Sequence, residues 1–169
     1  KGLVDYVKYQ GVSLTDEGRN KAISVIRNSR LWEVFLVEKL GYAWDEVHAI
    51  AEQLEHVQSE TLINRLDAYL EFPTKDPHGD PIPDSKGRIR NHQNELLSSL
   101  KPGDHCSIVG VKDTSTTFLK YLDRQQITLG SELNIKYIEE FDQSMILEKS
   151  DRSFSVSHQT AQKIFVKKK

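Results

Sequence analysis

The spacing of hydrophobic residues changes along the chain, and each change predicts a different element. Residues 2–14 hold two short runs of β-favouring side chains separated by Gly11, a pattern typical of a two-stranded hairpin. Thr15 is a good helix N-cap, and the apolar residues after it recur with a mostly helical period up to Gly41, a common helix stop. We therefore predict a hairpin that leads directly into one long helix.

Two further helices and a loop are predicted next. Apolar residues lie on one side of a second helix over 44–57, and Ser59 can cap a third helix whose apolar stripe ends near Leu70. Residues 73–87 contain four of the chain's five prolines, which is too many for a regular element. Three helices with short connections predict a small helical domain.

The pattern becomes strand-like after a polar helical stretch beyond Gly87 and a turn at 101–104. Short apolar runs lie at 106–111, 132–138, 145–147, 154–156 and 164–166, interrupted by a helical stretch at 118–125 and a turn that Ser157 can cap. Short strands at this spacing indicate a small barrel, with the lysines at 167–169 as a solvated tail. The predicted fold class is α+β, with a hairpin at 1–14, a helical domain at 15–90 and a β-domain at 91–169.

Composition narrows the class of protein. The 169 residues carry 23 Lys+Arg against 25 Asp+Glu, a net charge of −2, which argues against strong nucleic-acid binding by this chain alone. No apolar run approaches the ~20 residues that cross a bilayer, so no membrane partner is expected. Cys106 is the only cysteine, which fits a reducing cytoplasm. Because the chain opens with Lys1 rather than Met, and a lone hairpin is marginal in water, we expect a fragment of a longer protein.

The clearest chemical signal is HAIAEQLEH at residues 48–56. At ~100° per residue, four ligand-type side chains share one helical face without interrupting the apolar side. These are His48, Glu52, Glu55 and His56. Carboxylate oxygens and neutral imidazole nitrogens are typical ligands of divalent metal ions. The alternative is a solvated surface, but two glutamates on adjacent turns, with no Lys or Arg at 44–60, favour a bound cation.

Weaker candidates for metal ligands lie elsewhere. Glu33 is on the first helix, and Asp76 and His78 are in the proline-rich loop. Taken alone, the loop residues are better explained as polar turn positions, and Asp113 in the β-domain is a weaker candidate still. The sequence contains no nucleophile elbow, phosphate-binding glycine loop, zinc-finger spacing or dinucleotide fingerprint, so an enzyme is not expected.

These motifs resemble the diphtheria toxin repressor family, the metal-dependent transcriptional regulators of bacteria and archaea. The resemblance rests on SRLWEVFLVEKLGYAWDEVHAIAEQLEH at 29–56 and on DPHGDPIP at 76–83. The hairpin, with T-x-x-G after it, is similar to the wing of that family's winged helix-turn-helix. LKPGDHCSIVGV, LGSELNI and SVSHQTAQKIFV resemble its Src-homology-3-like, FeoA-type barrel. The helix-turn-helix itself is not in the chain, so the expected DNA-binding residues lie outside it.

The resemblance implies two metal sites in each subunit and a homodimer formed by the helical domain. Glu52, Glu55 and His56 occupy the positions of the primary, activating site, which in the family also takes a ligand from the N-terminus of the DNA-binding domain. Iron-responsive members tend to have Cys at the position of Glu52, whereas manganese-responsive members resemble this sequence.

The second, ancillary site is implied in the same way. Its matching positions are Glu33 and His48, with Asp113 near the place where the barrel contributes an acidic ligand, and Asp76 and His78 at loop positions that some manganese-type members use. Ser29 departs from the pattern, because most members carry His there.

The resemblance therefore implies a cytoplasmic, dimeric repressor that senses Mn²⁺ or Fe²⁺, binds operator DNA and controls metal-uptake genes, with no small-molecule substrate. An oxygen-rich ligand set with imidazole agrees with that class of metal but does not separate manganese from iron. The alternative is a metal-binding transport-accessory module without a DNA function. A carboxylate-bridged metal enzyme would need a second glutamate-rich helix with Glu-x-x-His spacing, which the sequence lacks.

Overall fold

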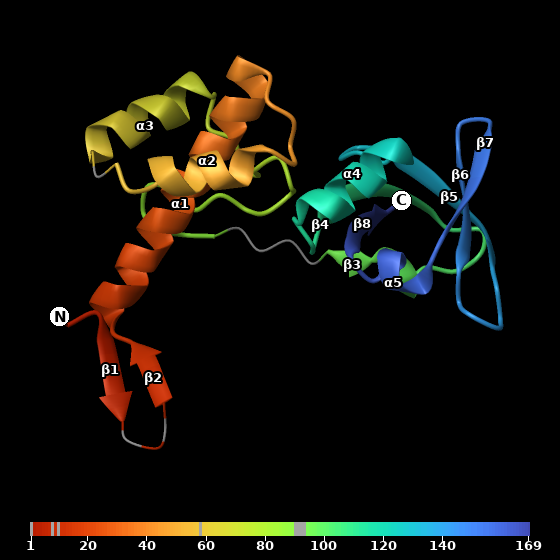
Figure 1. Cartoon of the computed structure of the whole chain (residues 1–169), viewed down its shortest axis with the longest axis horizontal. Coiled ribbons are helices and arrows are strands. Elements are labelled where there is room, and N and C mark those ends of the chain that lie inside the picture. The colour runs from red at the N-terminus through yellow and green to blue at the C-terminus, as the bar shows by residue number, and fades with distance from the viewer. Residues whose placement is uncertain (1, 8, 10, 58, 90–93) are drawn as a thin grey trace. The chain divides into compact units, whose positions relative to one another are not determined.

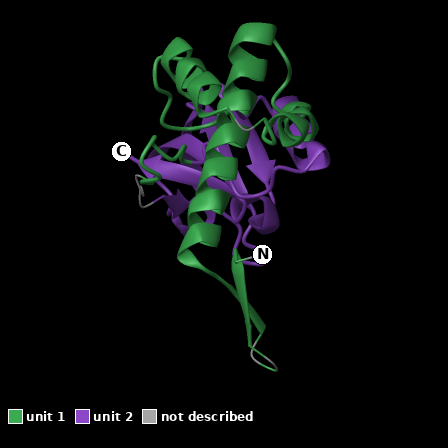
Figure 2. Cartoon of the chain, turned by 90° about the vertical axis from the view of Figure 1, so that its left-hand side faces the viewer, with its two compact units in different colours: residues 1–77, 81–91 green, residues 78–80, 92–169 purple. Residues whose placement is uncertain are grey.

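The computed structural model describes residues 2–7, 9, 11–57, 59–89 and 94–169. Backbone contacts divide the chain into two compact units, which Figure 2 colours separately. The first unit consists of residues 1–77 and 81–91, and the second of residues 78–80 and 92–169. Three residues of the proline-rich loop, 78–80, therefore belong to the second unit, whereas the loop on either side of them belongs to the first.

The first unit begins with a hairpin that leads into a long helix (Figure 1). Strands β1 (Val4–Val7) and β2 (Gly11–Leu14) pair antiparallel, and helix α1 (Asp16–Leu40) follows. The Thr15 side chain caps the start of α1, and Gly41 ends it with a left-handed backbone at φ 72°. The predicted hairpin, the N-cap and the helix stop are confirmed.

The hairpin is held closely against the start of α1. The Thr15 amide donates to the Leu3 carbonyl at 3.1 Å, and the Thr15 hydroxyl donates to the Gly2 carbonyl at 2.8 Å. A Cβ on Gly18 would lie 1.9 Å from the Leu3 carbonyl oxygen. Glycine costs a helix about 1 kcal/mol relative to alanine, so Gly18 is explained by this close approach of strand and helix.

Two shorter helices pack with α1 to form the core of the first unit. They are α2 (Val47–Leu54) and α3 (Glu60–Tyr69), and the Ser59 side chain caps α3 as predicted. The core consists of Leu31, Val34, Ile63, Leu66, Leu70 and Ile82, with Leu36, Val47 and Ala51 in a neighbouring cluster. No helix in the described part of the chain is both long and apolar enough to cross a membrane.

Helix α2 is shorter than the predicted 44–57. Residues 44–46 form a turn instead, in which the Glu46 carboxylate accepts from the Ala43 amide at 3.3 Å. At the other end, α2 stops at Leu54, so His56 lies beyond the last helical turn. The helical spacing that put four ligand-type residues on one face therefore does not extend to His56.

The second unit is a six-stranded antiparallel sheet in the order β3-β8-β4-β5-β6-β7. Its elements are β3 (Glu95–Leu96), η1 (Leu97–Ser99), β4 (His105–Val111), α4 (Thr116–Arg124), β5 (Glu132–Ile138), β6 (Met145–Lys149), β7 (Arg152–Val156), α5 (His158–Ala161) and β8 (Ile164–Lys168). Fully buried side chains from α4 and the strands, among them Leu119, Leu122, Leu133, Ile135, Leu147 and Ile164, fill its core. The predicted strands, the helix near 118–125 and the Ser157 cap are confirmed.

The prediction of a polar helical stretch beyond Gly87 is wrong for the residues that the structure describes. Residues 95–99 form β3 and η1, because Leu97 and Leu100 are buried and β3 pairs with β8. Sheet pairing and burial outweigh the weak local helical preference of these residues. Part of the predicted stretch, residues 90–93, lies outside the described residues.

The prediction of a lysine tail at 167–169 is wrong only in its secondary structure. Lys168 is the last residue of β8, and its Nζ lies 2.8 Å from the Asp104 carboxylate. Lys169 Nζ lies 2.6 Å from the Glu132 carboxylate. The side chains of residues 167–169 are exposed as predicted, but Lys168 and Lys169 also pair with carboxylates of neighbouring segments.

Candidate metal centre

A buried carboxylate on α1 is the centre of the candidate site. Glu33 lies between Leu31 and Val34 of the hydrophobic core, and its side chain is only 5% exposed. A carboxylate buried to this extent is costly unless cations or hydrogen-bond donors surround it. One partner is the His48 imidazole of α2, whose Nδ1 lies 3.2 Å from Glu33 Oε1.

The proline-rich loop carries two more ligand-type side chains. The loop folds back on itself, because Lys75 and Pro81 form a bridge and the Ile82 amide donates to the Thr74 carbonyl at 3.0 Å. Asp76 and His78 lie inside this fold-back and are only 5% and 2% exposed. A loop of polar and proline residues thus buries an acid and an imidazole rather than presenting them to solvent.

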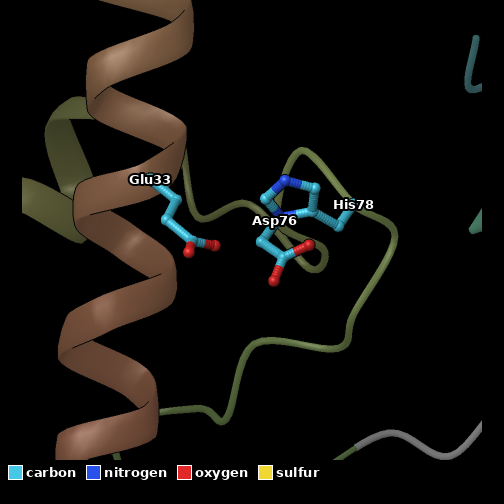
Figure 3. A group of neighbouring side chains, drawn as sticks. All are labelled: Glu33, Asp76 and His78. Atoms are coloured by element: carbon cyan, nitrogen blue, oxygen red, sulfur yellow. The ribbon is translucent and has the colours of Figure 1, made fainter. Parts of the chain in front are cut away.

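Glu33, Asp76 and His78 form one group of candidate metal ligands. Figure 3 shows their side chains pointing toward one another from α1 and from the loop. One ligand atom from each lies within 4.8 Å of those of the other two, and no other group of this kind occurs among the described residues. Opposite ligands of one ion are about 4.4 Å apart at bond lengths of about 2.2 Å, so a small inward shift suffices.

The chemistry of these three donors fits a divalent transition metal. Two carboxylates and one imidazole suit Mn²⁺ or Fe²⁺, whereas thiolates or thioethers would select softer ions. Cys106 is not part of this group, and burial raises the pKa of its thiol to about 11. The structure thus brings together three predicted ligands, Glu33, Asp76 and His78. A fourth, His48, contacts Glu33.

Arg30 belongs to the site although no sequence pattern singled it out. Its Nε lies 3.5 Å from Asp76 Oδ2, and its guanidinium also donates to the Pro81 carbonyl. Arg30 therefore fixes the loop on α1 and partly balances the acidic charge. The available signal was a cation one helical turn before Glu33, which is too common on helices to be diagnostic.

The other predicted ligand set is less closely assembled. Glu52 and His56 are exposed, the Glu55 side chain is 16% exposed, and His56 Nε2 lies 4.0 Å from Glu55 Oε1. Asn28 of α1 donates to the Glu55 carbonyl at 3.2 Å and so fixes the end of α2. A cavity of about 550 Å³ lies beside Glu55 and His56. The role of these residues as metal ligands stays a prediction.

Asp113 has other partners within the second unit. Lys163 Nζ lies 2.6 Å from Asp113 Oδ2, and the Ser115 amide donates to Asp113 Oδ1 at 2.9 Å. These hydrogen bonds, that of Lys163 first, lower the pKa of Asp113 to about 2. A metal ion would have to replace the Lys163 ammonium, so the role of Asp113 as a ligand stays a prediction.

Comparisons with known proteins decide the family. The family described as iron dependent repressor, metal binding and dimerisation domain matches residues 15–84, and the FeoA domain family matches residues 96–168. A solved manganese-dependent transcriptional repressor in complex with manganese is 38% identical with a TM-score of 0.88, and the match covers 99% of this chain and 78% of that one. The chain belongs to the diphtheria toxin repressor family. Its predicted order, a helical metal-binding and dimerisation domain followed by a FeoA domain, is confirmed.

Curated proteins related to this repressor family match over only part of their length. The iron-dependent repressor IdeR of Mycobacterium tuberculosis is 45% identical over 82 residues, which are 48% of this chain and 36% of that protein. A probable metal transport system membrane protein of Chlamydia trachomatis is 43% identical over 83 residues, which are 49% of this chain and 18% of that protein. The chain thus spans about a third of the length of the repressor that it matches.

The second unit, which matches the FeoA family, is expected to lose stability in acid through Asp113. The folded-state pKa of Asp113 lies below its ordinary value, so its contribution is present above about pH 4 and lost as the pH falls toward 2. Asp113→Asn is expected to cost up to about 1 kcal/mol at pH 6 and almost nothing near pH 2, because the ion pair with Lys163 is partly exposed. Urea unfolding at both pH values checks this. An equal effect of Asp113→Asn at the two pH values would contradict it, and Lys163→Met should behave like Asp113→Asn.

Proposed function

We propose that the chain is the metal-sensing and dimerising part of a DNA-binding transcriptional repressor that responds to Mn²⁺ or Fe²⁺. The buried group of Glu33, Asp76 and His78 is the single observation that carries this proposal. Family membership supports it, since the relatives include an iron-dependent repressor and a manganese-dependent transcriptional repressor. We assign residues 1–14 to the wing of a winged-helix domain, 15–90 to the metal-binding and dimerisation domain and 91–169 to the FeoA-type domain.

The side chains around Glu33 are arranged to receive a divalent cation. At an effective dielectric constant of 20, two carboxylates ~4 Å apart repel each other by ~4 kcal/mol. Arg30 offsets part of this charge at Asp76, and the imidazoles of His48 and His78 supply nitrogen ligands. A bound ion would supply the remaining positive charge, which favours the conformation that keeps the loop folded onto α1.

The ligand set at the end of α2 supports a change of conformation controlled by metal binding. Glu52, Glu55 and His56 lie near the end of α2, and Glu55 and His56 line a cavity there. In this conformation the three side chains are not gathered around a single point. Completing such a site requires the chain to close and a further ligand to enter. Metal would then favour the closed conformation by the difference in its affinity for the two states, which is how an effector acts.

A homodimer follows from the same proposal. The matched family is described as a dimerisation domain, and the first unit exposes the large apolar side chains of Leu40, Tyr69 and Phe72. At micromolar concentration, sedimentation should give twice the mass of 19.4 kDa. A monomer at that concentration would count against the proposal.

A second candidate is a metal-binding regulatory module of a transport protein, without a DNA function. The observation that favours it is the 43% identity to a probable metal transport system membrane protein of Chlamydia trachomatis. Metal binding at Glu33 would be common to both candidates. The two candidates differ in whether the complete protein binds operator DNA.

The test uses the complete gene product that carries this chain. Selection of binding sites from a random DNA duplex pool, with Mn²⁺ and again with a chelator, should enrich a two-fold symmetric sequence only when metal is present. The symmetry is expected because a dimer places two identical DNA-binding domains on the duplex. Failure to enrich any sequence with either Mn²⁺ or Fe²⁺ would overturn the repressor assignment and favour the transport module.

A further inference from the structure

Residues 78–80 lie directly on strand β4, backbone against backbone. The Val111 amide donates to the His78 carbonyl at 2.9 Å. Gly79 has φ +91°, and a Cβ placed there would lie 2.3 Å from the Val109 carbonyl oxygen and 2.4 Å from the Gly110 Cα. Such distances are far inside van der Waals contact, so no side chain fits at position 79 without moving the loop or the strand.

Strand β4 is shaped to accept this contact. Its pairing with β8 shifts register between Ile108 and Gly110, and Gly110 is close to the backbone of His78 and Gly79. A Cβ on Gly110 would lie 3.3 Å from the His78 carbonyl oxygen and 3.5 Å from the Gly79 Cα. Two glycines in different segments therefore let the loop approach to a distance that only backbone atoms allow.

The contact matters because it fixes the backbone that carries a candidate ligand. His78 is 2% exposed, and its imidazole belongs to the group with Glu33 and Asp76. Asp76 is held from one side by Arg30, whereas the peptide after His78 is held by β4. The chain is therefore fixed on both sides of the His78 imidazole.

We propose that Gly79 is a positioning residue for a divalent-cation site, and that its contact with Gly110 holds the His78 imidazole in register with Glu33 and Asp76. This inference rests on the proposed metal-binding function. It concerns the backbone around His78 and leaves the predicted set of ligands, Asp113 included, unchanged. Residues that orient a metal ligand typically contribute 10- to 100-fold to affinity, roughly the size of effect expected here.

The test compares two glycines with almost the same backbone conformation. Gly103 has φ +90° and nothing within 4 Å of the place of its Cβ, whereas Gly79 has φ +91° and a severe clash. Gly103→Ala thus carries the conformational strain of an alanine at positive φ without the collision. Mn²⁺ affinity of the 169-residue chain is measured from the loss of the free-Mn²⁺ electron paramagnetic resonance signal, and Glu33→Gln identifies the site concerned.

Gly79→Ala is expected to weaken the Glu33-dependent Mn²⁺ affinity at least about tenfold, whereas Gly103→Ala changes it less than about twofold. The Mn²⁺ affinity of Gly110→Ala, whose added Cβ makes a milder contact, should lie between those of the other two variants. Gly110→Ala replaces Gly79→Ala in the test if Gly79→Ala does not fold. Hydrogen exchange of the peptide containing Val111 should slow on addition of Mn²⁺ in the wild type but not in Glu33→Gln. A wild-type chain without Glu33-dependent Mn²⁺ binding would overturn both the proposed function and this inference. Unchanged affinity in Gly79→Ala or Gly110→Ala would overturn the inference alone.

Discussion

Glu33→Gln is expected to lower the affinity of the site for Mn²⁺ by about 100-fold or more, because it removes the charged ligand around which His48, Asp76 and His78 gather. Glutamine keeps the size of the side chain and a carbonyl oxygen but loses the negative charge. The metal-free protein should stay folded, since removing one of two buried carboxylates relieves repulsion.

Thermal unfolding and calorimetry with Mn²⁺ measure this effect. At 100 times its dissociation constant, a ligand stabilises the folded state by about 2.7 kcal/mol, so Mn²⁺ should raise the unfolding temperature of the wild type clearly. Glu38→Gln is the matched control, because Glu38 lies on the same helix with a side chain that is 54% exposed. If Glu33→Gln kept the wild-type Mn²⁺ stabilisation, the assignment of this site would fail.

Arg27→Ala is expected to destabilise the first unit by about 3–5 kcal/mol. The guanidinium of Arg27 on α1 lies 2.7 Å from Asp67 Oδ2 and donates to Asn64 Oδ1 at 3.2 Å, so it ties α3 to α1. The side chains of Arg27 and Asp67 are only 9% and 15% exposed. Removing the cation leaves the Asp67 charge buried without its counterion, and that desolvation cost dominates the loss.

The two tryptophans make this prediction simple to measure. Trp32 and Trp44 are the chain's only tryptophans and both lie in the first unit, so their fluorescence reports urea unfolding of that unit alone. The double variant Arg27→Met with Asp67→Leu should recover most of the lost stability, because it removes both charges together. Equal destabilisation in the single and double variants would show that packing, rather than the ion pair, is lost.

The sequence predicted the elements best where local signals and packing agree. Thr15, Gly41 and Ser59 mark helix ends through hydrogen bonds and backbone conformations that depend on a few neighbouring residues. Strand β3 was missed because only its pairing with β8, seventy residues later in the chain, makes it a strand. The end of α2 was misplaced for a related reason, since a polar helical pattern gives no sharp stop.

The candidate site was predictable only in part. Asp76 and His78 are separated from Glu33 by more than forty residues, and no spacing rule brings a loop of that kind onto a helix. The resemblance to the repressor family proposed them, and the structure places them with Glu33. Arg30 and Gly79 lie within the quoted motifs, but nothing in the sequence showed their roles, because these depend on contacts with distant segments of the chain.

The central claim is that this chain holds a site for Mn²⁺ or Fe²⁺ built on Glu33, Asp76 and His78. Calorimetric titration of the metal-free 169-residue chain with Mn²⁺ and with Mg²⁺ tests it most directly. A site with an imidazole ligand should bind Mn²⁺ much more tightly than Mg²⁺, which keeps its water ligands and prefers oxygen. The account predicts at least about a hundredfold preference for Mn²⁺ on these grounds. Equal affinity for the two ions would contradict it.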